Sequence, residues 1–230
     1  MAGVVWKTWL ACLDVVFRRT SHSIHSLVLH CLQFTRDYCL SPNTIVVSPF
    51  VINVKWEFPP IGYTKINVDG SSLGCPSLAG IGGIVCDDHG RFICSFAESV
   101  GITFAYIAEA LAVRQAPQLA FDRGFSHIIL ESDNLMIVNL LKRTTTVSPW
   151  RIAHIIDDCL TLSDLFPQTY FKHTFRQGNT VVDSLANFGT HSQASHFWDV
   201  NPPNFLSPFF IADLAGIFMP CSVSFGASLI

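Results

Sequence analysis

Charged residues are scarce in this sequence. They make up 13% of the 230 residues, and the formal net charge is −3. Fourteen Lys and Arg are too few for broad, non-specific attraction to a polyanion, which depends on clustered positive charge. Any nucleic-acid partner must therefore be held locally or with the help of metal ions. Half of the residues are hydrophobic, which excludes a disordered chain, and the length suits one core domain plus extensions.

Features of secreted, zinc-binding and membrane proteins are also missing. The eight cysteines form no CxxC pair and lack the Cys/His spacing of a zinc site, and scattered thiols fit a reducing compartment. Lys7 and Asp14 interrupt the only apolar stretch near the start, so no secretory signal is evident. The apolar run 44–54 is too short to span a bilayer, and the run 205–219 is interrupted. We therefore expect an intracellular, soluble protein without a membrane partner, in the nucleus or the cytoplasm, and a monomer by default.

Hydrophobic periodicity divides the chain into three parts. Residues 1–55 are expected to form an N-terminal helical and linker segment, with helices within 1–40; residues 56–192 the main domain; and residues 193–230 a C-terminal extension. Within the main domain the pattern predicts strands at 65–69, 79–86, 91–97, 127–130 and 169–175, and helices at 104–121, 134–143, 150–165 and 180–188.

The order of these elements predicts an α/β fold. Three consecutive strands favour antiparallel pairing, whereas the later strand–helix–strand crossovers favour parallel pairing with right-handed connections. We therefore expect a mixed five-stranded sheet flanked by helices. Pro117 falls inside the predicted helix 104–121 and is expected to kink or end it.

Four carboxylates occupy unusual positions in this pattern. Asp69 ends the first strand of the domain, and Asp133 follows a buried strand. Glu109 lies on the alanine-rich, sheet-facing side of its helix, where a lone carboxylate is costly to desolvate, and Asp183 lies in the first turns of the last helix. Strand ends and helix starts converge on one rim of an α/β sheet. Carboxylates gathered there repel one another unless cations neutralise them, and oxygen-only ligands suit Mg²⁺ or Mn²⁺.

Each carboxylate has a simpler interpretation when it is taken alone. Asp69 could begin an Asp-Gly turn, and Glu109 could be a solvated helix residue. Asp133 could cap a helix, and Asp183 could complement a helix dipole. The order and context of the four together favour a shared metal site.

The segments around these carboxylates can be compared with known signatures. They are Ile66-Asn67-Val68-Asp69-Gly70-Ser71, Ala108-Glu109-Ala110, Leu130-Glu131-Ser132-Asp133 and Asn179-Thr180-Val181-Val182-Asp183-Ser184-Leu185-Ala186. In this order they resemble the signatures of the type 1 ribonuclease H family, in its plant form related to non-LTR retrotransposon reverse transcriptases. The stretch 80–85 is similar to the second strand of that group, and the resemblance covers roughly residues 52–218.

The resemblance implies a ribonuclease H-like fold and a two-metal-ion endonuclease. Such an enzyme binds RNA–DNA hybrids and hydrolyses the RNA strand, leaving a 5′-phosphate and a 3′-hydroxyl, with two Mg²⁺ or Mn²⁺ ions. By the same resemblance Asp69 would bridge both ions, Glu109 and Asp133 would hold the second, and Asp183 the first. Family members also read ribose 2′-hydroxyls near the glutamate.

The resemblance also indicates further site residues. The candidates for substrate binding are Gly70, Ser71, Asn134 and Asn179. The loop before Asp183 is short, and two residues there are alternative helpers in catalysis. His173 could serve as a proton shuttle or lie within the strand as a satisfied polar residue. Arg176 could contact the scissile phosphate or assist product release.

Some features depart from the bacterial members of the family. The basic protrusion that grips hybrids has no counterpart beyond Lys142-Arg143, which alone is more typical of a solvated helix end. The main alternative function is therefore a catalytically weak or inactive, retroelement-derived nucleic-acid-binding module. A third hypothesis is another nuclease of the same superfamily, such as an exonuclease or a junction resolvase.

Overall fold

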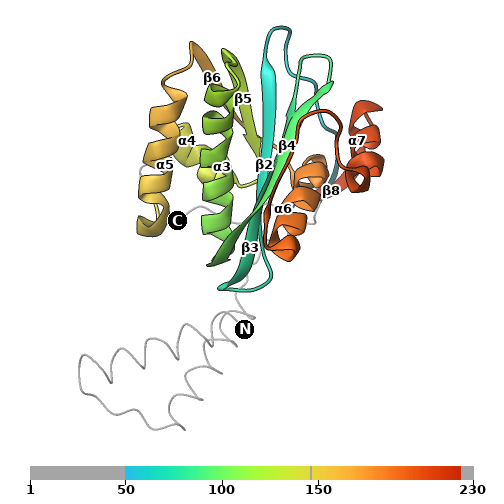
Figure 1. Cartoon of the computed structure of the whole chain (residues 1–230). Helices are drawn as coiled ribbons and strands as arrows, with labels where there is room; N and C mark the ends of the chain where they lie inside the picture. The colour runs from blue at the N-terminus through green and yellow to red at the C-terminus, as the bar shows by residue number, and fades with distance from the viewer. Residues whose placement is uncertain (1–49, 146, 224–230) are drawn as a thin grey trace, which may run out of the picture. The chain divides into compact units, whose positions relative to one another are not determined.

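A mixed sheet of six strands, in the order β6-β5-β2-β3-β4-β7, forms the centre of the fold (Figure 1). The structure is a computed structural model that describes residues 50–145 and 147–223, so the expectation of helices within 1–40 lies outside the described residues. The strands of this sheet are β2 (Thr64–Ser72), β3 (Ser77–Cys86), β4 (Phe92–Thr103), β5 (His127–Ser132), β6 (Gln168–His173) and β7 (Ser195–Trp198). A separate two-stranded ribbon pairs β1 (Phe50–Val54) with β8 (Met219–Val223) in antiparallel orientation.

The pairing of the strands follows the sequence prediction except at one edge. β2, β3 and β4 form an antiparallel meander, whereas β5 and β6 run parallel to β2. The expected number of five strands is wrong, because β7 pairs antiparallel with β4 as a sixth. β7 has only four residues and lies in the segment expected to be an extension, so its alternation is too short to be recognised alone. Its pairing covers an edge of β4 that would otherwise be open.

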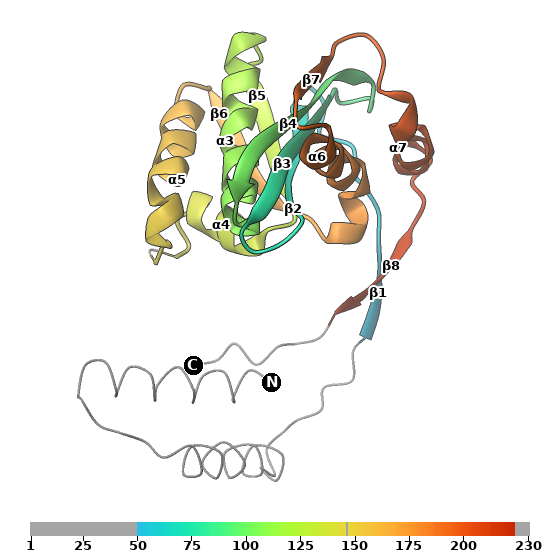
Figure 2. The ribbon, with the colours of Figure 1, turned by 60° about the horizontal axis from the view of Figure 1, so that its bottom comes forward.

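Helices cover both faces of the sheet, with α3 and α5 on one face and α6 on the other (Figures 1 and 2). The helices are α3 (Ala105–Asp122), α4 (Leu135–Leu141), α5 (Trp150–Ser163), α6 (Thr180–Ser192) and α7 (Ser207–Leu214), with short 3₁₀ turns η1 (Arg176–Gly178) and η2 (Asn204–Leu206). Each face has its own buried core. One core contains Ile66 and Val113, and the other contains Ile84 and Leu185. Among the described helices, none is both long enough and apolar enough to cross a membrane.

The glycines of β3 let α6 approach the sheet closely. A Cβ atom on Gly82 would lie 2.4 Å from the backbone nitrogen of Ala186, and one on Gly80 would lie 2.3 Å from that of Thr190. Any side chain at these two positions would therefore push the helix away from the strand. Because α6 carries Asp183, this close packing also fixes the height of that carboxylate above the sheet.

Pro117 lies inside α3 without ending it. α3 continues five residues beyond it, to Asp122, so the expectation that Pro117 ends the helix is wrong. Proline has no backbone N–H, which deprives the carbonyl of Val113 of its usual helical donor. The thiol of the buried Cys159, on α5, donates to that carbonyl instead, with a sulfur–oxygen distance of 3.6 Å. A contact between helices thus satisfies the group that Pro117 leaves open.

Candidate active site

The parallel pairing of β2 with β5 brings Asp69 and Asp133 to the same rim of the sheet. Asn67 pairs with Glu131 across the two strands, and each aspartate lies two residues further along its strand direction. Asp69 is a buried residue within β2, and Asp133 directly follows β5. Glu109, in the second turn of α3, and Asp183, in the first turn of α6, come from the helices on the two faces. The four residues converge on one rim as predicted, but the expectation that Asp69 ends its strand is wrong, because β2 continues to Ser72.

Three of the four carboxylates meet at one point. Asp69, Glu109 and Asp133 each offer an oxygen atom, and these atoms all lie within 4.8 Å of one another. Asp183 lies outside this group of three, and its carboxylate is bonded to two other side chains. Nη2 of Arg176 donates to its Oδ1 at 2.8 Å, and Nδ2 of Asn187 donates to its Oδ2 at 3.2 Å.

Burial and mutual repulsion disfavour the charged forms of these groups. Burial, followed by the charges of Asp133 and Asp183, raises the pKa of Asp69 well above its usual value. Burial, followed by the charges of Asp69 and Asp133, raises the pKa of Glu109 to about 9. Burial also raises the pKa of Asp133, although the nearby Arg176 guanidinium opposes the shift. In the absence of a cation, the folded structure therefore favours the protonated form of each of these three carboxylates.

The site has the chemistry that a hard divalent cation requires. Oε2 of Glu109 is buried and has no hydrogen-bond partner among the described residues, although a carboxylate oxygen in such a place normally has one. It belongs to a group of possible metal-ligand atoms that are all carboxylate oxygens. Mg²⁺ and Mn²⁺ prefer such ligands and would relieve both the repulsion and the unsatisfied oxygen. The residues present thus fit the metal that the sequence predicts.

A chain of two hydrogen bonds connects Ser71 on β2 to Asp183 through Asn187. Oγ of Ser71 donates to Oδ1 of Asn187 at 2.6 Å, and the amide of Asn187 in turn donates to Asp183. The sequence analysis did not identify Asn187 as a site residue. Its position four residues after Asp183 on the same helix is the signal that could have found it, because residues four apart lie on one helix face.

The remaining predicted residues surround the rim in different ways. His173 is the last residue of β6, as the strand interpretation expects, and its ring lies 5.5 Å from that of Phe175 in an edge-on arrangement. Arg176 follows in η1 with its side chain 75% exposed, so the guanidinium can reach beyond Asp183. Asn134, rather than Asp133, caps α4, and its Oδ1 accepts the backbone N–H of Ile137 at 3.1 Å.

Two of the candidates for substrate binding have internal contacts. The side chain of Asn179 is buried, and its amide bonds to the backbone of β2 and to Asn67. The hydroxyl of Ser71 is directed to Asn187. Neither side chain is therefore free in this arrangement: Ser71 reaches Asp183 through Asn187, and Asn179 is bonded to β2 beside Asp69. The turn interpretation of Asp69 does not apply, because β2 continues to Ser72.

Gly70 is the point at which β2 and α3 touch. A Cβ atom there would lie 2.2 Å from the backbone nitrogen of Glu109 and 2.4 Å from the carbonyl carbon of Ala108. Its backbone N–H donates to Oδ1 of Asp69 at 2.9 Å. The absence of a side chain at Gly70 thus allows the helix to bring Glu109 beside Asp69.

We expect Gly70→Ala to destabilise the protein by about 3 kcal/mol, because backbone atoms of α3 cannot yield to the added methyl group as a side chain would. Thermal unfolding followed by circular dichroism would measure the loss. Gly74→Ala is the control, since its Cβ would meet only the Ser77 side chain, at 3.1 Å. Equal unfolding temperatures for Gly70→Ala and the unmodified chain would contradict the close contact.

Known proteins share this fold and this sequence pattern. Residues 67–189 match the family model described as reverse transcriptase-like. A curated Arabidopsis thaliana protein, whose name assigns it provisionally as a ribonuclease H protein, is 30% identical over 154 residues. The match covers 65% of this chain and 24% of that protein, so the chain spans about a quarter of the relative's length.

Solved structures agree with the family match. RNase H1 from the archaeon Halobacterium salinarum superposes with a TM-score of 0.55 at 23% identity, covering 56% of this chain and 98% of that chain. LC11-RNase H1, crystallised in complex with an RNA/DNA hybrid, gives a TM-score of 0.53 at 22% identity over 56% of this chain and 97% of its own. The chain therefore belongs to the reverse transcriptase-like family, and its sheet and helices have the ribonuclease H fold.

Proposed function

We propose that this protein is a nucleic-acid-binding endoribonuclease that hydrolyses the RNA strand of RNA–DNA hybrids. The observation that carries the proposal is the meeting of Asp69, Glu109 and Asp133 within 4.8 Å, with Asp183 held beside them. Carboxylates that come from two strands and two helices do not gather in this way for stability, because their mutual repulsion opposes folding. Family membership and the hybrid in the LC11-RNase H1 crystal point to the same substrate class.

Two Mg²⁺ or Mn²⁺ ions would be held by the four carboxylates of Asp69, Glu109, Asp133 and Asp183. Bound ions of this kind supply an activated water and stabilise the leaving oxygen in phosphodiester cleavage. The protein's own part is to hold the ligands in place: Gly70 N–H fixes the Asp69 carboxylate, and Asn187 fixes that of Asp183.

Arg176 and His173 are the proposed helpers beside the carboxylates. Arg176 neutralises Asp183 in the structure, and its exposed guanidinium is placed to contact a phosphate that approaches the carboxylates. His173 ends the strand that pairs with β5, across from Ser132, the residue before Asp133. We propose Arg176 as the contact to the scissile phosphate and His173 as the proton carrier.

The substrate would be recognised by its shape and its 2′-hydroxyls at the rim. The proposed contacts to the hybrid are the main-chain groups of Gly70, Ser71 and Asn134, which flank the carboxylates. With 14 basic residues in the chain, long-range attraction to the duplex is weak, so binding should rely on these local contacts and on the ions.

A cleavage panel tests the proposal. We expect the purified full chain with Mg²⁺ to cut the RNA strand of a labelled RNA–DNA hybrid, and to leave single-stranded RNA, duplex DNA and four-way DNA junctions intact. Adding EDTA should stop the reaction, and mapping the ends should identify 5′-phosphates. Binding of the hybrid without cleavage would instead support an inactive nucleic-acid-binding module, which the low number of basic residues also permits. Cleavage of junctions or duplex DNA would assign a different nuclease activity.

A further inference from the structure

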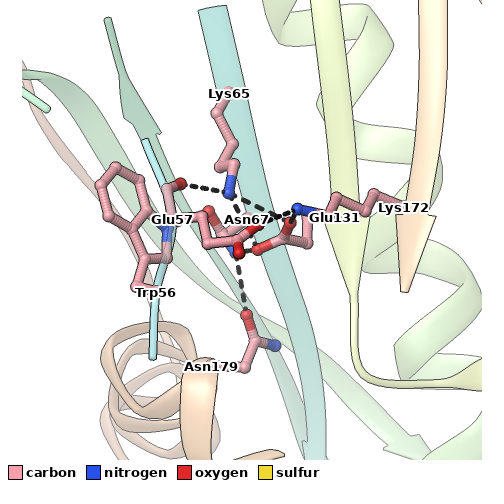
Figure 3. Close-up of polar contacts among 7 residues, drawn as sticks. All are labelled: Trp56, Glu57, Lys65, Asn67, Glu131, Lys172 and Asn179. Carbon is pink, nitrogen blue, oxygen red and sulfur yellow. Dashed lines mark hydrogen bonds and ion pairs between the residues drawn. The ribbon is translucent and has the colours of Figure 1, made fainter. Parts of the chain in front are cut away.

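A second group of polar side chains is buried around β2 and β5, the strands that lead to Asp69 and Asp133 (Figure 3). We call it the Asn67 network; its members are Trp56, Lys65, Asn67, Glu131 and Asn179. Lys65, Glu131 and Asn179 are each 2% exposed, and Asn67 is 3% exposed. Charged residues are seldom buried to this extent unless they are paired. The members come from the segment before β2, from β2, from β5 and from the residue between η1 and α6.

An ion pair lies at one end of the Asn67 network. Nζ of Lys65 is 3.1 Å from Oε2 of Glu131, donates to the backbone carbonyl of Glu57 at 2.6 Å and lies 4.8 Å from the centre of the Trp56 ring. This pair joins β2 to β5 four residues before Asp69 and two residues before Asp133. A buried ion pair adds little net stability compared with an apolar core. A gain in stability therefore does not explain why Lys65 and Glu131 are buried here.

Asn67 connects the ion pair to the rest of the group. Its Nδ2 donates to Oε1 of Glu131 at 2.9 Å and to Oδ1 of Asn179 at 3.2 Å, and its Oδ1 accepts the indole N–H of Trp56 at 3.0 Å. One side chain thus holds three segments that are far apart in the sequence. Figure 3 shows the Asn179 side chain pointing toward this centre from the start of α6.

Asn179 connects the Asn67 network to Asp183. It occupies the N-cap position of α6, but its side chain makes no capping hydrogen bond. Instead, its Nδ2 donates at 3.1 Å to the backbone carbonyl of Val68, the residue before Asp69. The backbone carbonyl of Asn179 accepts the N–H of Asp183 at 3.1 Å, within the first turn of the helix. A single residue therefore ties the backbone beside Asp69 to the turn that carries Asp183.

We propose that the Asn67 network is the positioning device of the acidic site, with Asn179 as the residue that sets Asp183 against Asp69. The inference rests on the proposed function and deepens it. Lys65, Glu131 and Asn67 fix β2 against β5, so that Asp69 and Asp133 meet; Asn179 then fixes the first turn of α6 to the same strand. Groups that orient metal ligands in this way commonly change metal affinity or activity by about 10–100-fold when they are removed.

The test compares Asn179→Ala with a core variant of similar stability. Because the Asn179 side chain makes no capping hydrogen bond, we expect α6 to keep its length when the side chain is removed. Ile156→Ala is the control, since it creates a cavity in the buried core and lies on α5, a helix that carries none of the site residues. Both variants are assayed as full chains at a temperature at which circular dichroism shows them folded. The measurements are kcat and KM on a labelled RNA–DNA hybrid, and Mn²⁺ affinity by titration calorimetry without substrate.

We expect Asn179→Ala to lower kcat and Mn²⁺ affinity by about tenfold or more, with KM for the hybrid unchanged, and Ile156→Ala to keep both wild-type values. If Asn179→Ala does not fold, Asn179→Ser, which keeps a small polar group, should show the same pattern. Wild-type kcat and Mn²⁺ affinity in the Asn179 variant would overturn this inference and leave the proposed function standing. A wild-type chain that neither binds Mn²⁺ nor cuts the hybrid would overturn the proposed function and this inference with it.

Discussion

Asp69→Asn is expected to abolish cleavage of the RNA–DNA hybrid and to stabilise the metal-free protein at the same time. The asparagine keeps the shape and an acceptor for the Gly70 N–H but removes the charge that the other carboxylates face. Metal ions that stabilise the transition state contribute several kcal/mol, and each 1.4 kcal/mol is a factor of ten in rate. We therefore expect a loss of about a thousandfold or more in kcat.

The gain in stability has a separate physical cause. Without a cation, the buried Asp69 carboxylate is repelled by Asp133 and Asp183, and its neutralisation relieves that repulsion. In a chain of this size, each kcal/mol gained should raise the unfolding temperature by about 2–4 °C. The increase should appear in EDTA and become smaller with saturating Mg²⁺, because the ions relieve the same repulsion in the unmodified protein.

A matched control separates this effect from a general change in net charge. Asp157→Asn removes one negative charge from an exposed residue of α5, and it should change neither hybrid cleavage nor the unfolding temperature. Activity and thermal unfolding in EDTA are measured on the same preparations. Undiminished cleavage by Asp69→Asn, or a lower unfolding temperature in EDTA, would mean that Asp69 is not part of a repelling, metal-binding group.

The parts of the fold that follow strong periodicity could be predicted from the sequence. Alternating residues before Asp69 and the apolar run before Asp133 locate β2 and β5, and the alanine-rich face of α3 places Glu109 toward the sheet. Once the two strands are parallel, geometry alone brings the two aspartates to one rim. The acidic site could therefore be predicted, because its residues lie on regular elements whose direction and periodicity are readable in the sequence.

Features that depend on contacts between distant segments could not be predicted. The four residues of β7 become a strand only because the edge of β4 is available to them. The helix α3 continues through Pro117 because the Cys159 thiol, 42 residues later, satisfies a carbonyl of that helix. Local sequence rules contain neither piece of information.

The Asn67 network was hidden for a different reason. Lys65 and Asn67 occupy alternate positions of an apparently amphipathic strand, where polar residues are expected to face solvent. In the structure that face is covered, and the polar groups satisfy one another across β2, β5 and the start of α6. The alternation of polar and apolar residues predicts the strand correctly. It does not indicate whether the polar side of that strand is exposed or paired with buried partners.

Without divalent cations, the protein is expected to lose stability as the pH rises from about 5 to 9. Glu109 has a folded pKa of about 9 against an ordinary value of 4.5, because burial and the charges of Asp69 and Asp133 disfavour its ionised form. Between these two values the folded state binds more protons than the unfolded state, so stability is greatest below the lower value and declines toward the upper one. The raised pKa values of Asp69 and Asp133 act in the same direction.

Other groups also contribute over this range. Burial raises the pKa of Asp213 to about 7, so this residue adds to the decline below that pH. The pKa values of Glu57, Asp87 and Asp88 are lowered, so their stabilising effect is complete above about pH 5 and does not vary there. The buried Lys65 has a lowered pKa and opposes the decline at alkaline pH. Glu109→Gln isolates the contribution of the acidic site, because it removes one of the repelling groups and leaves Lys65 and the surface carboxylates unchanged.

The measurement is the unfolding temperature of the unmodified chain and of Glu109→Gln between pH 5 and 9, each in EDTA and in saturating Mg²⁺. We expect a decline with pH in EDTA that is clearly shallower in Glu109→Gln. Binding of Mg²⁺ to the folded state alone adds about 2.7 kcal/mol at one hundred times its dissociation constant, and it should flatten the profile of the unmodified chain most at high pH. Parallel profiles for the two proteins in EDTA would show that Glu109 is not confined among other negative charges. The effect of Mg²⁺ must grow with pH if carboxylates are its ligands, because a cation competes with protons for the same oxygen atoms.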